Sequence, residues 1–521
     1  MSRALDDIPV AAARSGRGRR ARRAPRRGPL VAAPLTTALN GAVLLVTGAF
    51  VFMIVRLPWL GDLGVHAATI ERLRHDLTDP GNPMVDSPTQ SPYYSPWTVF
   101  LALLAKVTGL GTFDVLRVAA AIGFVLLLSG VWHFVRTLTP NPGAPPLAVL
   151  CLLFLWGREL MVWSGFLGFT SLSLNISYPS TFATGLGFHF LALLAKALHR
   201  PTQGWTRHIA LGLMWAVMTL SHQFSGVVFT FGALGVLASV RTRPSGALWL
   251  RLGAGLATGL LVLAVWPYYS FFGLFGVGGL ESIHRDLYSR SLLRFTLLPV
   301  GVLALALRLR RNRRDPLVIW FLLGLLTVGA GALLDKWSLG RAEPAMVIPA
   351  QLAAAICAVE GGKRLFRAVF STVLAVALVV GCWAQKDALG FVLREDALPD
   401  TVTEGAVNAR TSYEWVTPYT SYGDVFMTGE WTAQKVPAYG GYTVIPGYPD
   451  FFLPDERQRR ADTERYFART TPREERLAIL RKYHVTWVLQ WRDEGGLSGK
   501  DPALRFVKKG PNAQFLYRVV G

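Results

Sequence analysis

The sequence predicts a polytopic α-helical membrane protein with a soluble α/β domain at its C-terminus. The chain of 521 residues is 51% hydrophobic and has a mean hydropathy of +0.34. Apolar runs close to the roughly 20 residues that cross a bilayer recur through its first three quarters. Helices are expected there because they satisfy their own backbone polar groups in lipid. From about residue 386 onward, β-branched and aromatic runs replace the long apolar segments.

Residues 1–35 form a basic tail that we expect to be disordered and cytoplasmic. Nine arginines lie between Arg3 and Arg27, in a Gly/Ala/Pro-rich stretch without apolar periodicity. The net charge of +21 is concentrated here and in short loops beside apolar runs. This pattern follows the positive-inside rule and favours contact with the lipid bilayer. It argues against nucleic acid as a partner. No small-residue cleavage site follows the first apolar run, so we expect it to be a retained helix.

The transmembrane domain is expected to cover residues 36–385 and to contain about eleven transmembrane helices. If all the apolar segments crossed, the basic loops "KALHRPTQGWTRH", "RTRPSGALWLR", "RLRRNRRDP" and "GGKRLFR" would lie outside, against the charge rule. Excluding the short segment 97–110, which contains Lys106, places all four loops inside. We therefore expect 97–110 to be a partial or re-entrant helix. Twelve segments are candidates in all: 36–57, 97–110, 115–137, 146–163, 180–198, 208–222, 224–241, 249–270, 293–308, 317–334, 345–361 and 367–384.

With eleven crossings and a cytoplasmic N-terminus, residues 386–521 would lie on the extracytoplasmic side of the membrane. "YGDVFMTGEW", "YTVIPGY", "VTWVLQW" and "QFLYRVVG" are typical of strands. "DERQRRADTERYFART" and "TPREERLAILRKYHV" are typical of amphipathic helices. Such a segment is long enough to have its own core. We expect an extracytoplasmic α/β domain attached to a multi-pass protein of the plasma membrane.

The long external loop 58–96 contains the first candidate site residues. Asp62 and His66 lie in "GDLGVHAATIERL", directly after the first apolar segment. A helix here would lie in the membrane interface, with Val65, Ile70, Leu73 and Leu77 on one face and Glu71, Arg72, Arg74 and Asp76 on the other. The extended "SPYYSPW" that follows contains Tyr93 and Tyr94. On position alone, Asp62 is either a reacting carboxylate or a boundary residue in water, and His66 is either a site neighbour or an interfacial histidine.

Three further outward segments carry polar candidates. "DKWSLGRAEP" places Lys336 and Arg341 before an apolar helix, where the charge rule predicts few cations. Arg341 is therefore a candidate phosphate ligand, the alternative being headgroup anchoring. "TLSHQFSG" contains His222, which is either a site residue or a helix-end histidine bonded to the backbone. "SLNISYPSTF" contains Tyr178, a candidate stacking surface for a sugar.

A first membrane helix, then "GDLGVHAATIERL", then "SPYYSPW" before another helix resembles the GT-C superfamily. These integral-membrane glycosyltransferases use polyprenyl-phosphate-linked sugars, and the subset with a C-terminal external α/β domain fits best. The resemblance implies that Asp62 is the general base of an inverting transfer and that Arg341 lies near the donor phosphate. It implies a glycan, lipid or protein as the acceptor. A histidine stands near the position of His222 in some of these proteins.

The sequence departs from many GT-C proteins in ways that bear on cofactors and activity. Many have two adjacent acids in the first loop, often tied to a divalent metal, whereas Leu63 follows Asp62 here. A second external acidic motif is not evident in 164–180. The sequence therefore indicates no particular cofactor, and a divalent metal stays an alternative. A catalytically silent relative of these enzymes is also left open.

Two functions of other classes also fit the composition. One is a transporter or flippase for a lipid-linked or small polar substrate, and the other is a non-catalytic cell-envelope assembly protein. Transporters keep ionisable residues at mid-membrane depth and contain internal repeats. Here Glu159 is the main acid within an apolar segment, and the halves show no repeat. The enzyme is therefore the favoured hypothesis.

Overall fold

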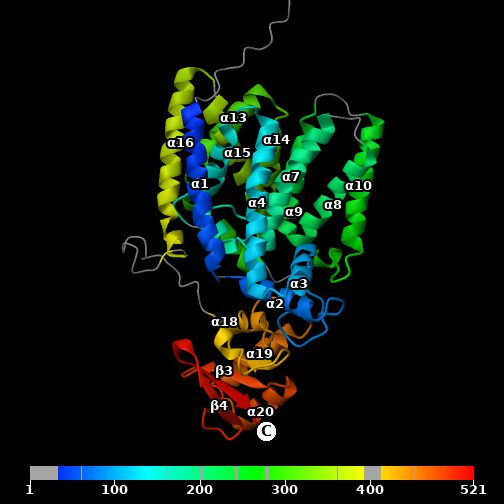
Figure 1. Ribbon diagram of the computed structural model, residues 1–521, viewed down its shortest axis with the longest axis vertical. Helices are drawn as coiled ribbons and strands as arrows, with labels where there is room; N and C mark the ends of the chain where they lie inside the picture. Colours follow the sequence, from blue (N-terminus) through cyan, green and yellow to red (C-terminus); the bar gives the residue numbers. More distant parts are fainter. Residues whose placement is uncertain are drawn as a thin grey trace, which may run out of the picture.

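The computed structural model shows a helical bundle with a small α/β domain at one end (Figure 1). The predicted disordered tail lies almost entirely outside the described residues. The structure describes residues 33–59, 61–159, 161–199, 204–240, 245–275, 281–360, 362–391, 393, 412–450 and 452–520.

Every predicted apolar segment overlaps a helix, although the segment 293–308 is continuously helical only from Pro299. Two predicted segments end early: 146–163 is helical only to Phe154 and 249–270 only to Ala264. In the first, the backbone N–H of Arg158 bonds the carbonyl of Leu293 instead of continuing a helix. In the second, Pro267 ends the helix. The bundle contains α1 (Ala33–Arg56), α3 (Pro96–Thr108), α4 (Thr112–Leu138), α5 (Ala144–Phe154), α7 (Pro179–His199), α8 (Trp205–Ser221), α9 (Gln223–Ala238), α10 (Gly246–Ala264), α13 (Pro299–Arg311), α14 (Pro316–Leu333), α15 (Pro344–Glu360) and α16 (Arg364–Ala384).

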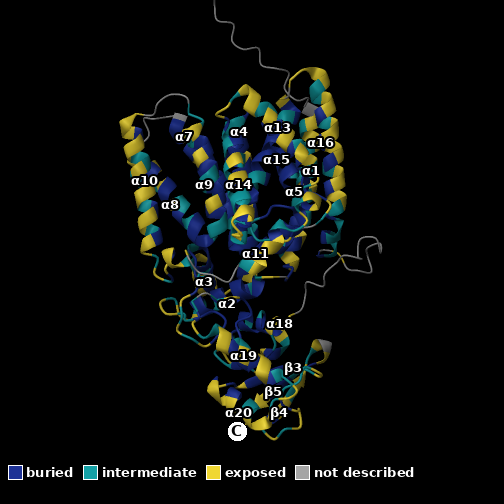
Figure 2. Ribbon diagram, turned by 180° about the vertical axis from the view of Figure 1, so that it is seen from behind, coloured by how far each residue is buried: buried dark blue, intermediate teal, exposed yellow. Residues whose placement is uncertain are grey.

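Seven helices in the described part of the chain are long and apolar enough to cross a membrane. Large apolar side chains face outward from the peripheral helices, for example Leu45 on α1 and Val379 on α16, which are 78% and 69% exposed. By contrast, α15 lies in the centre of the bundle and is almost wholly buried (Figure 2). Exposed apolar rows around a packed centre are typical of a protein embedded in lipid. The count of eleven crossings stays a prediction.

The two ends of the bundle differ. The C-terminal domain, α2 (Leu63–His75) and α3 lie at one end, whereas α13 ends and α16 begins at the other (Figure 1). At that far end Arg308 forms an ion pair with Asp315 at 2.7 Å. The basic residues 308–316 and 362–367 therefore lie at the end of the bundle opposite the C-terminal domain. The 13-residue α3, expected to be a partial helix, packs beside α2.

The C-terminal domain contains a five-stranded sheet of order β2-β1-β3-β5-β4. The first three strands are parallel, and β5 is antiparallel to both its neighbours. Four strands and both helices lie in predicted segments, but the edge strand β4 was not predicted. Its sequence LRFVKK has the lysines of a protected sheet edge rather than an alternating pattern. The elements are β1 (Val425–Met427), α18 (Glu430–Ala433), η6 (Val436–Tyr439), β2 (Tyr442–Thr443), α19 (Glu456–Phe467), α20 (Arg473–Lys482), β3 (Trp487–Trp491), β4 (Leu504–Lys509) and β5 (Gln514–Val519).

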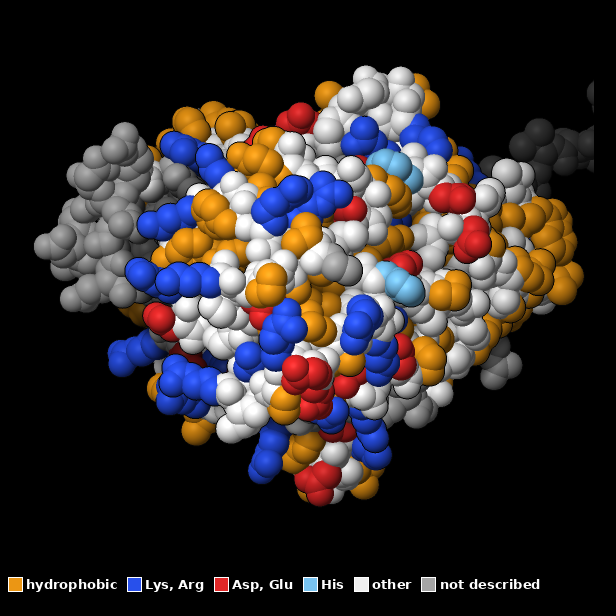
Figure 3. All heavy atoms as spheres, turned by 90° about the horizontal axis from the view of Figure 1, so that it is seen from below, with side chains coloured by type: hydrophobic (Ala, Val, Ile, Leu, Met, Phe, Trp, Pro, Cys, Tyr) orange, Lys and Arg blue, Asp and Glu red, His pale blue; other side chains and the backbone are white. Residues whose placement is uncertain are grey.

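The outer face of this domain has a mixed, highly charged surface. Figure 3 shows Lys and Arg side chains spread over it, among acidic and hydrophobic ones. A surface with interspersed charges of both signs is typical of a domain in water. The exposed cations of the domain include Arg457, Arg469, Arg481, Lys508 and Lys509.

Helix α2 lies between the bundle and the C-terminal domain (Figure 1). Most of its residues are buried, and Arg72, expected on a water-facing side, is fully buried. The guanidinium of Arg72 donates hydrogen bonds to the carbonyls of Gly440 and Gly441. The prediction is therefore wrong for Arg72, because the C-terminal domain covers it, whereas Val65 and Leu73 are buried and Asp76 is exposed as expected.

Candidate active site

Asp62 lies at the first turn of α2 with its carboxylate not used for capping. The preceding Gly61 has φ +62°, a left-handed conformation that glycine adopts without strain. Asp62 occupies the N-cap position, but its side chain makes no cap hydrogen bond. The half-buried carboxylate is therefore available for another purpose.

Two opposing effects set the basicity of this carboxylate. Burial raises the pKa of Asp62, and the positive charge of Arg341 lowers it by a smaller amount. The net pKa is above the usual value of 3.8. A carboxylate with a raised pKa is a stronger base than one in water, provided that it is deprotonated at the working pH. Asp62 therefore lies within the electrostatic influence of Arg341, which is far from it in the sequence.

His66 lies one turn further along α2, within a cluster of aromatic rings. Its ring centroid is 4.7 Å from that of Tyr178 and 5.6 Å from that of Tyr93. Burial lowers the pKa of His66 to about 3, so the ring is neutral at physiological pH. Its Nδ1 has no hydrogen-bond partner among the described residues. His66 can therefore exchange a hydrogen bond with a ligand, but it cannot neutralise a phosphate.

Tyr178 is buried against the turn that holds Asp62. Its hydroxyl lies within hydrogen-bonding range of the backbone of Asp62 and Leu63. A Cβ added at Gly61 would lie 3.5 Å from the same hydroxyl. The side chain of Tyr178 therefore packs against the turn that holds Asp62.

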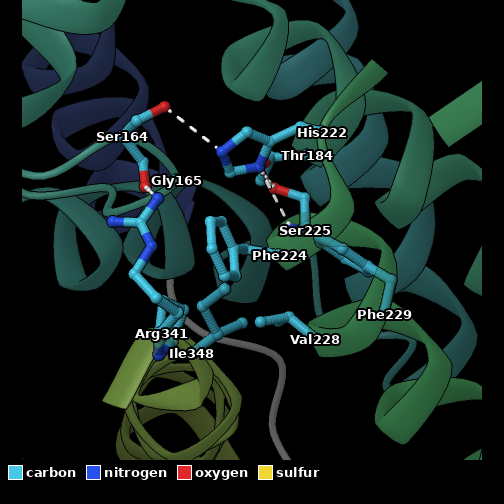
Figure 4. Close-up of a pocket in the computed structure, with 11 residues that line it drawn as sticks. Ser164, Gly165, Thr184, His222, Phe224, Ser225, Val228, Phe229, Arg341 and Ile348 are labelled. Atoms are coloured by element: carbon cyan, nitrogen blue, oxygen red, sulfur yellow. Dashed lines mark hydrogen bonds between the residues drawn. The ribbon is translucent and has the colours of Figure 1, made fainter. Parts of the chain in front are cut away.

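Arg341 and His222 line a small cavity in the bundle, together with Ser164 and Phe224 (Figure 4). Arg341 lies on η2 (Trp337–Ala342) and is buried. Its Nη2 donates to the carbonyl of Ser164 at 2.9 Å, and its guanidinium carbon lies 4.3 Å from the ring centroid of Phe224. Its Nε and Nη1 have no hydrogen-bond partner among the described residues. A buried cation with two unpaired donors has the right chemistry for a phosphate.

His222 has a structural role and also faces this cavity. Its Nδ1 accepts the backbone N–H of Ser225 at 3.1 Å and caps α9, as the helix-end alternative predicts. With Nδ1 an acceptor, the neutral ring carries its proton on Nε2, which lies 3.3 Å from the hydroxyl of Ser164. The helix-end role of His222 is therefore present in the structure, and its role as a site residue stays a prediction.

The structure does not bring two of the predicted residues into this cluster. Lys336 is exposed at the start of η2. Tyr94 is buried in the external loop, and its hydroxyl donates to the carbonyl of Gly81 at 2.8 Å. Asp62, His66, Tyr93, Tyr178, Arg341 and His222 do lie at the same end of the bundle, around Asp62 and the adjoining cavity.

A tyrosine of the C-terminal domain, not predicted from the sequence, also contacts the turn that holds Asp62. The hydroxyl of Tyr448 donates to the carbonyl of Gly61 at 2.7 Å. The sequence around Tyr448, "IPGYPD", has no feature that distinguishes this tyrosine from an ordinary loop residue.

Within the described ranges, the structure has no group of three or more His, Cys, Asp and Glu side chains that could hold a metal ion.

Comparison with solved structures shows which fold this is. The chain is similar to the arabinofuranosyltransferase AftD from Mycobacteria, at 16% identity and a TM-score of 0.56, over 95% of this chain and 40% of that one. It is also similar to ArnT from Cupriavidus metallidurans in the apo state, at 14% identity and a TM-score of 0.54, over 93% and 98%. ArnT bound to undecaprenyl phosphate matches at 15% identity and a TM-score of 0.52, over the same shares.

These matches confirm the predicted resemblance at the level of the fold. The chain has the fold of the GT-C membrane glycosyltransferases, and it spans less than half the length of AftD but nearly all of ArnT. No family model and no curated protein sequence matches it.

Proposed function

From the GT-C fold and the site around Asp62, we propose that this chain is a membrane glycosyltransferase. It moves a sugar from a polyprenyl-phosphate-linked donor to an extracytoplasmic glycan, lipid or protein. The observation that carries the proposal is a partly buried carboxylate that feels the positive charge of a buried guanidinium, whose Nε and Nη1 have no hydrogen-bond partner among the described residues. ArnT, which has this fold, is known bound to undecaprenyl phosphate.

The proposed reaction is an inverting displacement. The acceptor hydroxyl gives its proton to Asp62 as its oxygen attacks the anomeric carbon, and the bond from that carbon to the phosphate oxygen breaks. The electron pair of that bond leaves on the phosphate, which becomes more negative. Arg341 stabilises this charge through its free donors, in a site where burial strengthens the interaction. Neutral His66 and the rings of Tyr93 and Tyr178 orient the sugar.

Replacement of the base tests this reaction most directly. Asp62→Asn and Asp62→Ala are assayed in purified protein for transfer from a panel of polyprenyl-phosphate sugars. We expect both to lower kcat by about 10²–10⁴-fold, because general-base catalysis contributes that much. Asp76→Asn is the matched control, since Asp76 is an exposed acid at the other end of the same helix. Full activity of both Asp62 variants would show that the base is another group.

Removal of the guanidinium tests the donor site separately. Arg341→Ala is expected to weaken binding of polyprenyl phosphate while the helical bundle stays folded. Unchanged donor affinity would exclude Arg341 from the site. If no sugar is transferred but a lipid-linked or small polar substrate crosses liposomes, the transporter hypothesis replaces the enzyme. Reporter tags at both termini test the proposed sidedness, with a cytoplasmic N-terminus and an external C-terminal domain.

A further inference from the structure

The C-terminal domain reaches the catalytic turn directly. Tyr448 follows β2 and is buried in an apolar cluster with Val65 and Ala68 of α2. Its hydroxyl bonds the carbonyl of Gly61, the residue before Asp62. Because the Asp62 side chain does not cap its own helix, this bond restrains a turn that lacks the usual local support.

Arg72 is the second contact, near the end of the same helix. It is fully buried and donates its bonds to two carbonyls of the C-terminal domain, at Gly440 and Gly441. Its guanidinium also lies 3.5 Å from the ring centroid of Tyr442. No carboxylate lies within 4 Å of it in the described ranges. A buried cation needs such partners to offset its desolvation, so the position of α2 depends on the domain.

The third contact is backbone against backbone. A Cβ added at Gly64 would lie 1.7 Å from the carbonyl oxygen of Gln434. The first turn of α2 therefore rests directly on the chain after α18. Beyond the helix, Asn82 donates to the carboxylate of Asp450 at 2.6 Å and fixes the rest of the external loop to the same domain.

We propose that the C-terminal domain is the positioning element of the catalytic aspartate, with Tyr448 as a positioning residue. Contacts at 61, 64 and 72 hold both ends of α2, and Asp62 lies between the first two. The inference rests on the proposed role of Asp62 as general base. It assigns the domain a part in the reaction that does not require it to touch either substrate.

Tyr448→Phe in the full-length protein removes one hydroxyl and tests this inference. We expect kcat to fall about tenfold, because small misplacements of a catalytic group are costly, with the Kd for polyprenyl phosphate unchanged. Amide hydrogen exchange at residues 61–66 should increase. Tyr483→Phe is the control, because its hydroxyl bonds Asp462 at 2.8 Å next to α20, at the far end of the domain from α2 (Figure 1). It should leave all three measurements unchanged.

The outcomes separate the inference from the proposed function. If Tyr448→Phe has the same kcat and the same amide hydrogen exchange at residues 61–66 as the wild type, the inference is overturned. A lower kcat with unchanged exchange would also overturn it, since Tyr448 would then act on substrate and not through the turn. If the wild type transfers no sugar from any donor, the proposed function fails. Hydrogen exchange at 61–66 then still decides whether Tyr448 holds this turn.

Discussion

Gly64→Ala should separate α2 from the C-terminal domain with the addition of one methyl group. The new Cβ would lie 1.7 Å from the carbonyl oxygen of Gln434 and 2.9 Å from its carbon. Both obstacles are backbone atoms, so no side-chain rotation can relieve the overlap. The two segments must move apart or the helix must tilt.

The size of the movement follows from the contact distance. A carbon and a carbonyl oxygen approach to about 3.3 Å, so the overlap requires a displacement of about 1.6 Å. A catalytic group misplaced by about 1 Å can cost about 100-fold in rate. We therefore expect kcat to fall about 100-fold, which corresponds to about 2.7 kcal/mol of transition-state stabilisation. Donor affinity should be retained, because Arg341 and His222 belong to the bundle and not to α2.

The assay measures single-turnover transfer from a labelled polyprenyl-phosphate sugar, with donor binding as evidence that the protein is folded. Gly48→Ala in α1 is the matched control, since a Cβ at Gly48 meets nothing within 4 Å. It should leave kcat unchanged and stabilise α1 slightly, by up to about 1 kcal/mol. If Gly64→Ala has the kcat of the wild type, close packing at Gly64 does not position Asp62 for the reaction.

Three charged groups, Asp62, Arg341 and Lys435, should each have a measurable effect on activity, donor binding or stability. Burial raises the pKa of Asp62 above 3.8, and the base must be deprotonated, so log(kcat/KM) should rise with pH through a midpoint above 3.8. If the Asp62→Asn variant shows the same rise of log(kcat/KM) with pH, the rise belongs to another group. Arg341→Lys keeps the charge but loses the planar fork, so the Kd for polyprenyl phosphate should increase about tenfold, and an unchanged Kd in a titration would contradict the phosphate contact. Burial lowers the pKa of Lys435 from 10.5 to about 8, so the unfolded chain binds more protons between these values and wild-type stability should rise with pH across this window. Lys435→Met should remove that rise and stabilise the protein at pH 7 by up to about 3 kcal/mol. If the unfolding free energies of the wild type and of Lys435→Met change in the same way from pH 7 to 10.5, Lys435 does not titrate in this way.

The sequence determined most of the elements, because each depends on local composition. Apolar run length located every helix of the bundle, and β-branched runs located four strands. The position of Asp62 at the start of α2 also followed from the sequence, since the apolar segment ends just before it. Where the local pattern was misleading, as at β4 or beyond Phe154, contacts made elsewhere in the chain decided the conformation.

Only the tertiary structure decided which of these residues meet. Hydropathy placed Arg72 on a water-facing side, yet a domain that begins more than 300 residues later in the sequence covers it. The same domain supplies Tyr448, and the bundle brings Arg341 close to Asp62. Periodicity reports the surroundings of one element, whereas these contacts depend on how distant elements pack. The sequence alone thus identified the acid and the cation of the proposed reaction, and the fold placed both at the end of the bundle that carries the C-terminal domain.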